Sequence, residues 1–178
     1  MKAEEKRCPW CLGHDIYVQY HDEDWGVPVH DDRELFEKLI LDGAQAGLSW
    51  LTILKKRENY RCAYHDFDIQ RIARYTEEDE QRLLQDEGIV RNRLKVKASI
   101  LNAKATLAVQ QEFGSLDTFL WSFVGGKTIT NQRQSMADMP VRSAESDAMS
   151  KALLKRGFKF VGSTICYAFM QAVGMVND

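Results

Sequence analysis

Two short stretches of the chain concentrate side chains that could hold a flat ligand. Residues 8–28, CPWCLGHDIYVQYHDEDWGVP, place Trp10, Tyr17, Tyr20 and Trp25 beside several acids and histidines. Residues 39–50, LILDGAQAGLSW, carry Asp42 and Trp50 in a helix-like apolar run. Flat rings stack on a planar ligand that is electron-poor or cationic, and a carboxylate accepts its hydrogen bonds or balances its charge. These residues together predict a pocket for a nucleobase.

Each of these features also has a plainer interpretation. An aromatic ring is more often part of a core than of a binding site. Gly43 and Gly47 could break the helix where the pocket is built, or they could simply allow close packing of helices. Four rings in a polar, turn-rich segment nevertheless suit a stacking pocket better than a core helix.

A second kind of chemistry is indicated by residues 83–103, LLQDEGIVRNRLKVKASILNA. One helix ends, a short GIV turn follows, and a basic helix begins at once. A helix–hairpin–helix of this kind can present backbone N–H groups and a helix N-terminus to a phosphate. The residues expected to contact a nucleic-acid backbone are Gly88, Arg91, Arg93 and Lys95. An ordinary helical corner with a solvated basic face remains the alternative for this stretch alone.

Cysteine and histidine near the start of the chain raise the possibility of a metal site. Cys8 and Cys11 form a C-x-x-C pair, and His14 and His21 follow closely. These are zinc ligands by type, but one C-x-x-C without a second pair is weak evidence. Free thiols in a surface loop are the alternative.

Composition indicates a globular, non-membrane protein. The 178 residues are 44% hydrophobic and 28% charged, which suits one domain spanning 1–178. The net charge of −2 conceals an asymmetry, because residues 1–50 hold 5 basic and 11 acidic residues whereas the remainder holds 19 and 15. The charged start and the lack of a long apolar run predict a cytoplasmic protein without a membrane span. Three basic clusters can neutralise a few phosphates without making the whole protein basic.

Helix signals dominate the elements that must position these side chains. Apolar residues repeat at helical spacing after five candidate N-caps, and glycines follow several of the helices. The expected caps are Asp31, Asp68, Thr76, Ser115 and either Ser143 or Ser146. The segment 160–176 is apolar nearly all round and predicts a buried helix, whereas KTITNQ (127–132) alone hints at extended chain. The expected fold is a compact all-α domain with a helix–hairpin–helix at about 77–108.

Five strings together resemble the DNA-3-methyladenine glycosylase I family, which belongs to the helix–hairpin–helix DNA glycosylases. They are YHDEDWGVP, QAGLSWLTILKKRENYR, DEGIVRNRLKVKASILNAKA, FLWSFV and KRGFKFVGSTICYAFMQAVGMVND. The resemblance runs in register from about Cys8 to Asp178. It implies a bacterial enzyme of base excision repair that flips 3-methyladenine out of alkylated double-stranded DNA. Hydrolysis of the N-glycosidic bond then leaves an abasic site.

The same resemblance implies roles for individual residues. Trp10, Tyr17, Tyr20 and Trp50 would line the base pocket, with Trp25 supporting it. Asp42 falls where the family has a glutamate that hydrogen-bonds the adenine edge, so the carboxylate here is nearer the backbone by roughly 1.5 Å. The family resemblance also implies that the general-base aspartate of the superfamily relatives is missing, and the matching motifs offer no spare acid for that role. We therefore expect base flipping and electrostatics to suffice for cleavage, with Asp42 as the catalytic residue.

The family resemblance also implies a structural zinc ion. Cys8 and His21 match the first pair of ligands, and the second pair would follow directly after Asp178, where the given sequence ends. No nucleotide cofactor is indicated, and a monomer is the default expectation.

Two other classes of function compete with the glycosylase interpretation. A damage-binding protein on the same fold would recognise alkylated DNA without cutting it. This hypothesis is motivated by the aspartate at position 42, where the family has a glutamate, and by the missing second pair of zinc ligands. A thiol-based or metal-responsive protein would depend on Cys8 and Cys11. Release of a free base distinguishes the first alternative from a glycosylase, and indifference to mutation of both cysteines would exclude the second.

Overall fold

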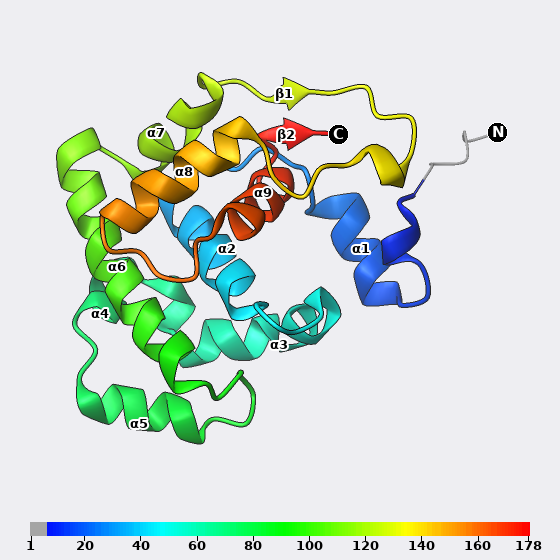
Figure 1. The fold of residues 1–178 in the computed structure, drawn as a ribbon. Helices are drawn as coiled ribbons and strands as arrows, with labels where there is room; N and C mark the ends of the chain where they lie inside the picture. Colours follow the sequence, from blue (N-terminus) through cyan, green and yellow to red (C-terminus); the bar gives the residue numbers. More distant parts are fainter. Residues whose placement is uncertain (1–6) are drawn as a thin grey trace.

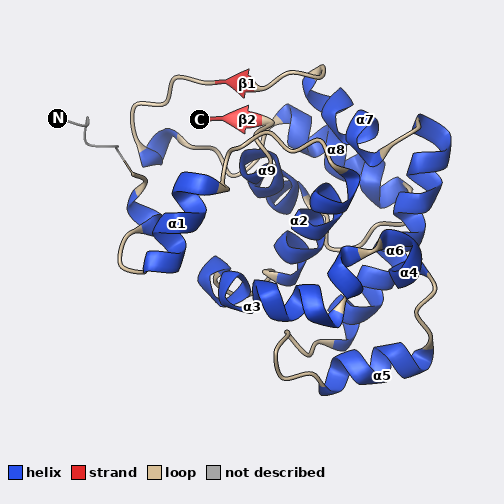
Figure 2. Cartoon of the chain, turned by 180° about the vertical axis from the view of Figure 1, so that it is seen from behind, coloured by secondary structure: helices blue, strands red, loops and turns tan. Residues whose placement is uncertain are grey.

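The computed structural model describes residues 7–178, and helices dominate it (Figures 1 and 2). The nine α-helices in this range are α1 (Asp15–Glu23), α2 (Asp32–Ala44), α3 (Trp50–Ala63), α4 (Ile69–Ala73), α5 (Glu77–Gln85), α6 (Arg93–Phe113), α7 (Leu116–Trp121), α8 (Ala144–Lys155) and α9 (Ser163–Ala172). Short 3-10 turns are η1 (Pro9–Cys11), η2 (His65–Phe67), η3 (Ser122–Val124) and η4 (Met136–Asp138). Two-residue strands are β1 (Ile129–Thr130) and β2 (Val176–Asn177). The all-α prediction is confirmed.

The core is centred on α2 and α9. Helix α2 packs against α3, α6, α7 and α9, and α8 lies along α9 (Figure 1). The buried side chains of α9 are Cys166, Tyr167, Phe169, Met170 and Ala172, which confirms the expected buried helix. Because α2 is enclosed by several helices, a residue near its end is removed from water unless a pocket reaches it.

The helix starts follow local side-chain chemistry. Asp31 accepts a hydrogen bond from Glu34 N–H, Asp68 from Arg71 N–H, and Thr76 from Asp79 N–H. Ser115 and Ser143 cap α7 and α8 in the same way, so Ser143 and not Ser146 is the cap of α8. Each bond satisfies a backbone N–H that the first helical turn leaves without a partner.

Three boundaries differ from the sequence-based expectation. The segment expected to be rich in turns contains α1, whose tyrosines at positions 17 and 20 lie one helical turn apart. The last helix ends at Ala172, and the segment expected to continue it to residue 176 instead turns and leads into β2. Gly174, at φ +76°, turns the chain so that Val176 pairs in parallel with Ile129. Helix α5 ends at Gln85, so Gly88 lies in the following loop and does not terminate it.

The two glycines between the expected pocket residues have different roles. Gly47 lies after α2 at φ +79°, a backbone conformation that favours glycine, and allows the chain to turn toward α3. Gly43 lies within α2, where an added Cβ would be 3.2 Å from Cβ of Phe160. Gly47 therefore allows the chain to turn after α2, and Gly43 allows close packing of α2 against Phe160, so both interpretations of the glycines hold.

The described residues include no helix that is both long and apolar enough to cross a membrane.

Candidate base-binding site and DNA-facing hairpin

A cluster of aromatic rings links the N-terminal turn to the body of the protein. The Trp10 ring lies 5.2 Å from Tyr17 and 5.3 Å from Trp25, both edge-on. Tyr17 and Tyr20 share one face of α1 because they are three residues apart. Figure 1 shows α1 at one side of the molecule, apart from the central helices. The cluster therefore forms one wall of any pocket between α1 and the core.

Trp50 supplies a ring from the opposite side. It is the first residue of α3, and Ser49 fixes the start of that helix by accepting a hydrogen bond from Thr52 N–H at 3.2 Å. The Trp50 ring lies 5.5 Å from that of Tyr20 at an interplanar angle of 46°. Its Nε1 atom is buried and has no hydrogen-bond partner. A buried indole N–H of this kind normally has an acceptor, so a ligand is one way to supply it.

Asp42 is an acid in an almost fully buried position. It lies in the last turn of α2, is 5% exposed, and its Oδ2 atom has no hydrogen-bond partner. Burial raises the pKa of the carboxyl group to about 7, and the positive charge of Lys38 partly opposes the rise. Near neutral pH, Asp42 therefore exists as both the acid and the carboxylate.

These residues surround one pocket of about 180 Å³. Its lining consists of Trp10, Tyr17, Tyr20, Trp25, Asp42, Gln45, Trp50, Ala168, Gln171 and Ala172. Pockets for drug-sized ligands occupy roughly 300–1,000 Å³, so this one suits a single planar ring system. The structure thus brings together all six residues that the sequence placed at a base site, although their contacts with a base stay a prediction.

Four lining residues were not identified from the sequence. Gln45 lies three residues after Asp42, and Gln171 is the polar residue of an apolar stretch of α9. A glutamine in such a stretch was a usable signal, because a buried amide needs hydrogen-bond partners. Gln171 donates from Nε2 to Asp178 Oδ2 at 2.8 Å, so the end of the described chain orients it. Ala168 and Ala172 gave no signal, since small residues on a buried helix are ordinary.

A cluster of three charged side chains lies beside the Tyr20 ring. Lys38 Nζ is 2.8 Å from Asp24 Oδ1, and Arg57 pairs with the other oxygen of Asp24. Both cationic groups lie just under 6 Å from the centre of the Tyr20 ring. Burial, followed by the charges of Asp42 and Asp24, raises the pKa of Tyr20 well above its usual range. The Tyr20 hydroxyl therefore stays neutral and can donate a hydrogen bond.

Cys8 and His21, expected as zinc ligands, are neighbours in the structure. The backbone N–H of Cys8 donates to His21 Nε2 at 3.3 Å, and His21 Nδ1 lies 2.9 Å from Asp22 Oδ1. Burial, with a smaller effect from Cys11, raises the pKa of the Cys8 thiol and so disfavours the thiolate that a metal needs. Across residues 7–178, no three His, Cys, Asp or Glu side chains are grouped to hold a metal. The described residues alone therefore do not fit a closed zinc site.

The expected hairpin connects α5 to α6 at the edge of the molecule (Figure 2). Arg91 and Arg93 are exposed there, and Asn92 caps α6 by accepting from Lys95 N–H at 3.1 Å. The turn itself differs from the expectation, because Gly88 N–H donates to Asp86 Oδ1 and Val90 N–H to the Tyr60 hydroxyl. A phosphate at this corner would therefore meet the start of α6 and the two arginines, not the amides of the GIV turn.

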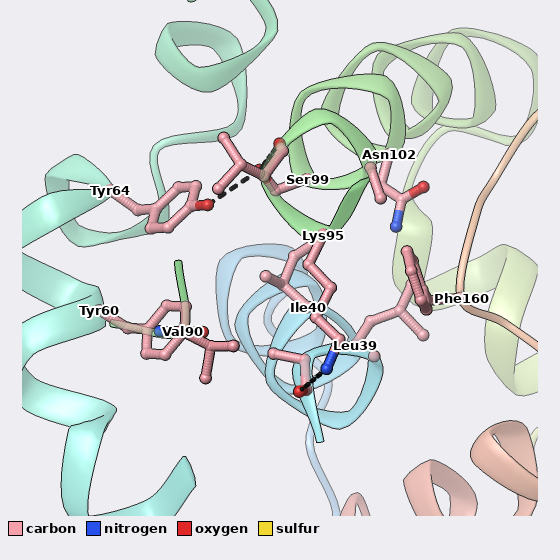
Figure 3. A pocket seen from close by; sticks show the side chains of 13 residues that line it. Leu39, Ile40, Tyr60, Tyr64, Val90, Lys95, Ser99, Asn102 and Phe160 are labelled. Carbon is pink, nitrogen blue, oxygen red and sulfur yellow. Dashed lines mark hydrogen bonds between the residues drawn. The ribbon is translucent and has the colours of Figure 1, made fainter. Parts of the chain in front are cut away.

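Gly88 and Lys95 are placed differently from the other two backbone candidates. Gly88 is packed against α3, where an added Cβ would be 2.9 Å from Cβ of Asn59. The ammonium group of Lys95 is directed into the protein and donates to the backbone carbonyls of Ala44 and Ala46. Figure 3 shows the first of these two hydrogen bonds. Lys95 is thus engaged away from the surface that the arginines share.

Comparison with known proteins gives a consistent result. A family model described as methyladenine glycosylase matches residues 10–178. DNA-3-methyladenine glycosylase 1 of Escherichia coli (strain K12) is 51% identical over 173 residues, covering 97% of this chain and 92% of the relative. A crystal structure of a 3-methyladenine DNA glycosylase I superposes with a TM-score of 0.94 at 55% identity, covering 97% and 95% of the two chains. A tyrosine-to-phenylalanine variant of such an enzyme, in complex with 3-methyladenine, has a TM-score of 0.92 at 37% identity and covers 95% and 91%.

Proposed function

We propose that this chain, which belongs to the methyladenine glycosylase family, binds 3-methyladenine flipped from alkylated duplex DNA and hydrolyses its N-glycosidic bond. One observation carries the proposal. The described residues contain two buried side-chain polar atoms without a hydrogen-bond partner, Asp42 Oδ2 and Trp50 Nε1, and both residues line the aromatic pocket. A nucleobase edge offers both donors and acceptors, so one base can satisfy both atoms.

The pocket chemistry supports adenine over guanine. As a carboxylate, Asp42 accepts a hydrogen bond from the N6 amino group of adenine, whereas the O6 acceptor of guanine would leave it unpaired and repel it. The aspartate reaches less far than a glutamate by roughly one C–C bond, about 1.5 Å. The pocket extends to Asp42 itself, so the base sits deeper to make this contact.

Methylation at N3 gives the base a positive charge and makes it a good leaving group. Binding of a cation lowers the pKa of a neighbouring carboxyl group, so the bound base favours the ionised form of Asp42. The aromatic faces stack on the cation, and the pocket excludes bulk water. As the bond to the sugar breaks, positive charge moves from the base to the sugar. The protein therefore works through positioning and electrostatics, and Asp42 is the one carboxyl group in the pocket lining.

The chromatographic release of free bases tests the proposal. Methylated duplex DNA is incubated with the wild-type protein and with Asp42→Ala, and Asp22→Asn serves as a control because Asp22 lies outside the pocket. The wild type and the control release 3-methyladenine and leave 7-methylguanine in the DNA, and Asp42→Ala loses the release. Binding of the DNA without release by the wild type would make the protein a damage-binding module. A second acid outside the pocket, as necessary as Asp42, would overturn the mechanism.

The proposed setting is a single-domain monomer acting in the bacterial cytoplasm. A pocket built from one chain supports the monomer, and light scattering of the purified protein tests it. Zinc stays a proposal in which Cys8 and His21 supply two ligands, supported by their closeness, with the metal replacing the hydrogen bond that the Cys8 backbone N–H donates to His21 Nε2. The metal content of the purified protein, with and without Cys8→Ala, tests that proposal.

A further inference from the structure

Lys95 is a lysine whose charge is directed into the protein. Its Nζ atom donates to the carbonyl oxygen of Ala44 at 2.8 Å and to that of Ala46 at 2.6 Å. Figure 3 shows the side chain running from α6 toward the end of α2. Lysine carries a strongly hydrated charge, so such a position needs a structural reason.

The end of α2 supplies that reason. The last carbonyls of a helix have no partner within the helix and carry a partial negative charge, which a cation stabilises. The last turn of α2 contains no basic residue of its own. Lys95 brings the missing cation from α6, a helix that begins nearly fifty residues later in the sequence.

The surroundings show that this is not a ligand site. The cavity beside Lys95 has a volume of about 20 Å³, enough for no more than a water molecule. No carboxylate among the described residues pairs with the ammonium group, and burial alone lowers the pKa of Lys95. The two carbonyl oxygens therefore hold it, and in turn it fixes their position.

The two carbonyls belong to a segment that builds the base pocket. Ala44 and Ala46 flank Gln45 and closely follow Asp42, and both Gln45 and Asp42 line the pocket. Two residues before Lys95 lies the exposed Arg93, at the start of the helix expected to meet the DNA backbone. Lys95 thus links the hairpin helix directly to the end of α2, the helix that carries the base-binding carboxylate.

We propose that Lys95 is a positioning residue that holds residues 42–46 in the geometry for reading the base, and that it makes no contact with DNA phosphate. The inference rests on the proposed function, since the position of residues 42–46 is tested by measuring how tightly the base binds. The side chain acts on Asp42 and Gln45 through the backbone of their own turn.

Two measurements on the 178-residue protein separate this role from a DNA contact. Calorimetry gives the affinity for free 3-methyladenine, and binding to undamaged duplex at several salt concentrations gives the salt dependence. Lys95→Met keeps the alkyl chain and removes the donors, so Asp42 and Gln45 lose part of their fixed position and base binding should weaken about tenfold. Its salt slope should equal that of the wild type, because no phosphate contact is lost.

Two controls give the contrasting patterns. Arg93→Met should reduce the salt slope by about 1 and leave base affinity unchanged. Lys104→Met removes an exposed lysine of the same helix and should leave both the base affinity and the salt slope unchanged within experimental error. Lys95→Gln retains an uncharged NH₂ donor group and should therefore lose less base affinity than Lys95→Met. It also replaces Lys95→Met in the test if that variant does not fold.

A reduced salt slope with unchanged base affinity in the Lys95 variants would overturn the inference and return Lys95 to the DNA contacts. Equal base affinity of the wild type and Lys95→Met would also overturn it. Failure of the wild type to bind 3-methyladenine would instead refute the proposed function, and with it the inference.

Discussion

Asp42 should make the unliganded protein less stable as the pH rises. The pKa of its carboxyl group lies at about 7 in the folded protein, against an ordinary value of 3.8. At about 1.4 kcal/mol per pKa unit, this difference corresponds to a cost of roughly 4 kcal/mol once the group is ionised in the folded state. Because the folded pKa is the higher one, the cost is absent below pH 3.8, grows between pH 4 and 7, and is complete above pH 7.

The substitution Asp42→Asn removes the ionisable group while keeping the shape. We expect the variant to gain stability relative to the wild type as the pH rises from 5 to 8, by up to about 3 kcal/mol. Urea unfolding at several pH values measures the free energy of unfolding of both proteins. Both proteins contain the same histidines, so the contribution of histidine titration cancels in the difference between their free energies of unfolding.

Glu112→Gln is the matched control. A hydrogen bond from Arg156 lowers the pKa of Glu112 below its ordinary value, so this group is essentially ionised in both the folded and the unfolded state between pH 5 and 8. The control should therefore leave the pH dependence of the wild type unchanged across this interval. Parallel curves for the wild type and Asp42→Asn would refute the reasoning, because they would mean that Asp42 is hydrated or paired.

Three further substitutions probe the groups around the pocket and the hairpin. Lys38→Met should raise the pKa of Asp42 further, because the Lys38 charge lowers it, and should move the pH midpoint of base binding upward. Trp50→Phe keeps a stacking ring and removes the unpartnered N–H, so KM for base release should rise severalfold. Gly88→Val should destabilise the protein by about 1–3 kcal/mol in thermal unfolding, because its Cβ would press on Asn59.

Each of these expectations has a result that contradicts it. An unshifted pH midpoint in Lys38→Met would show that the charge of Lys38 does not act on Asp42. Unchanged kinetics in Trp50→Phe would mean that the base does not accept from the indole. For Gly88→Val, the double variant with Asn59→Ala should recover most of the stability, and a lack of recovery would place the strain elsewhere in the loop.

The sequence predicted the elements whose causes are local. N-caps such as Asp31 and Thr76 act within four residues, and the structure confirms them. The aromatic residues of the pocket were also identifiable, because rings in a polar segment are unusual. Helix α1 was not predicted, since its sequence is largely polar and its helical state depends on packing of Tyr20 against the rest of the protein.

Side-chain direction was the main property that the sequence could not provide. Arg93 and Lys95 are two residues apart on a basic helix, and periodicity alone does not say which of them reaches a phosphate. The close approach of α2 decides it, since its carbonyls take the ammonium of Lys95 while Arg93 stays exposed. Gly88 likewise acts through contact with a helix 29 positions earlier in the chain, not through a special backbone angle.

The pocket differs from the rest of the fold in how its buried polar groups are paired. Elsewhere within residues 7–178 the buried polar side-chain atoms are paired, for example those of Asn102, which both donates to and accepts from the backbone of Lys159. At the pocket a carboxylate and an indole N–H are left without partners in the interior. Both impair folding stability, so the sequence retains them for another reason. A cationic base that supplies a positive charge and hydrogen bonds would relieve both defects at once, whereas a neutral base would offset the buried charge only in part. The penalty in the free protein therefore favours the methylated base over the normal bases in undamaged DNA.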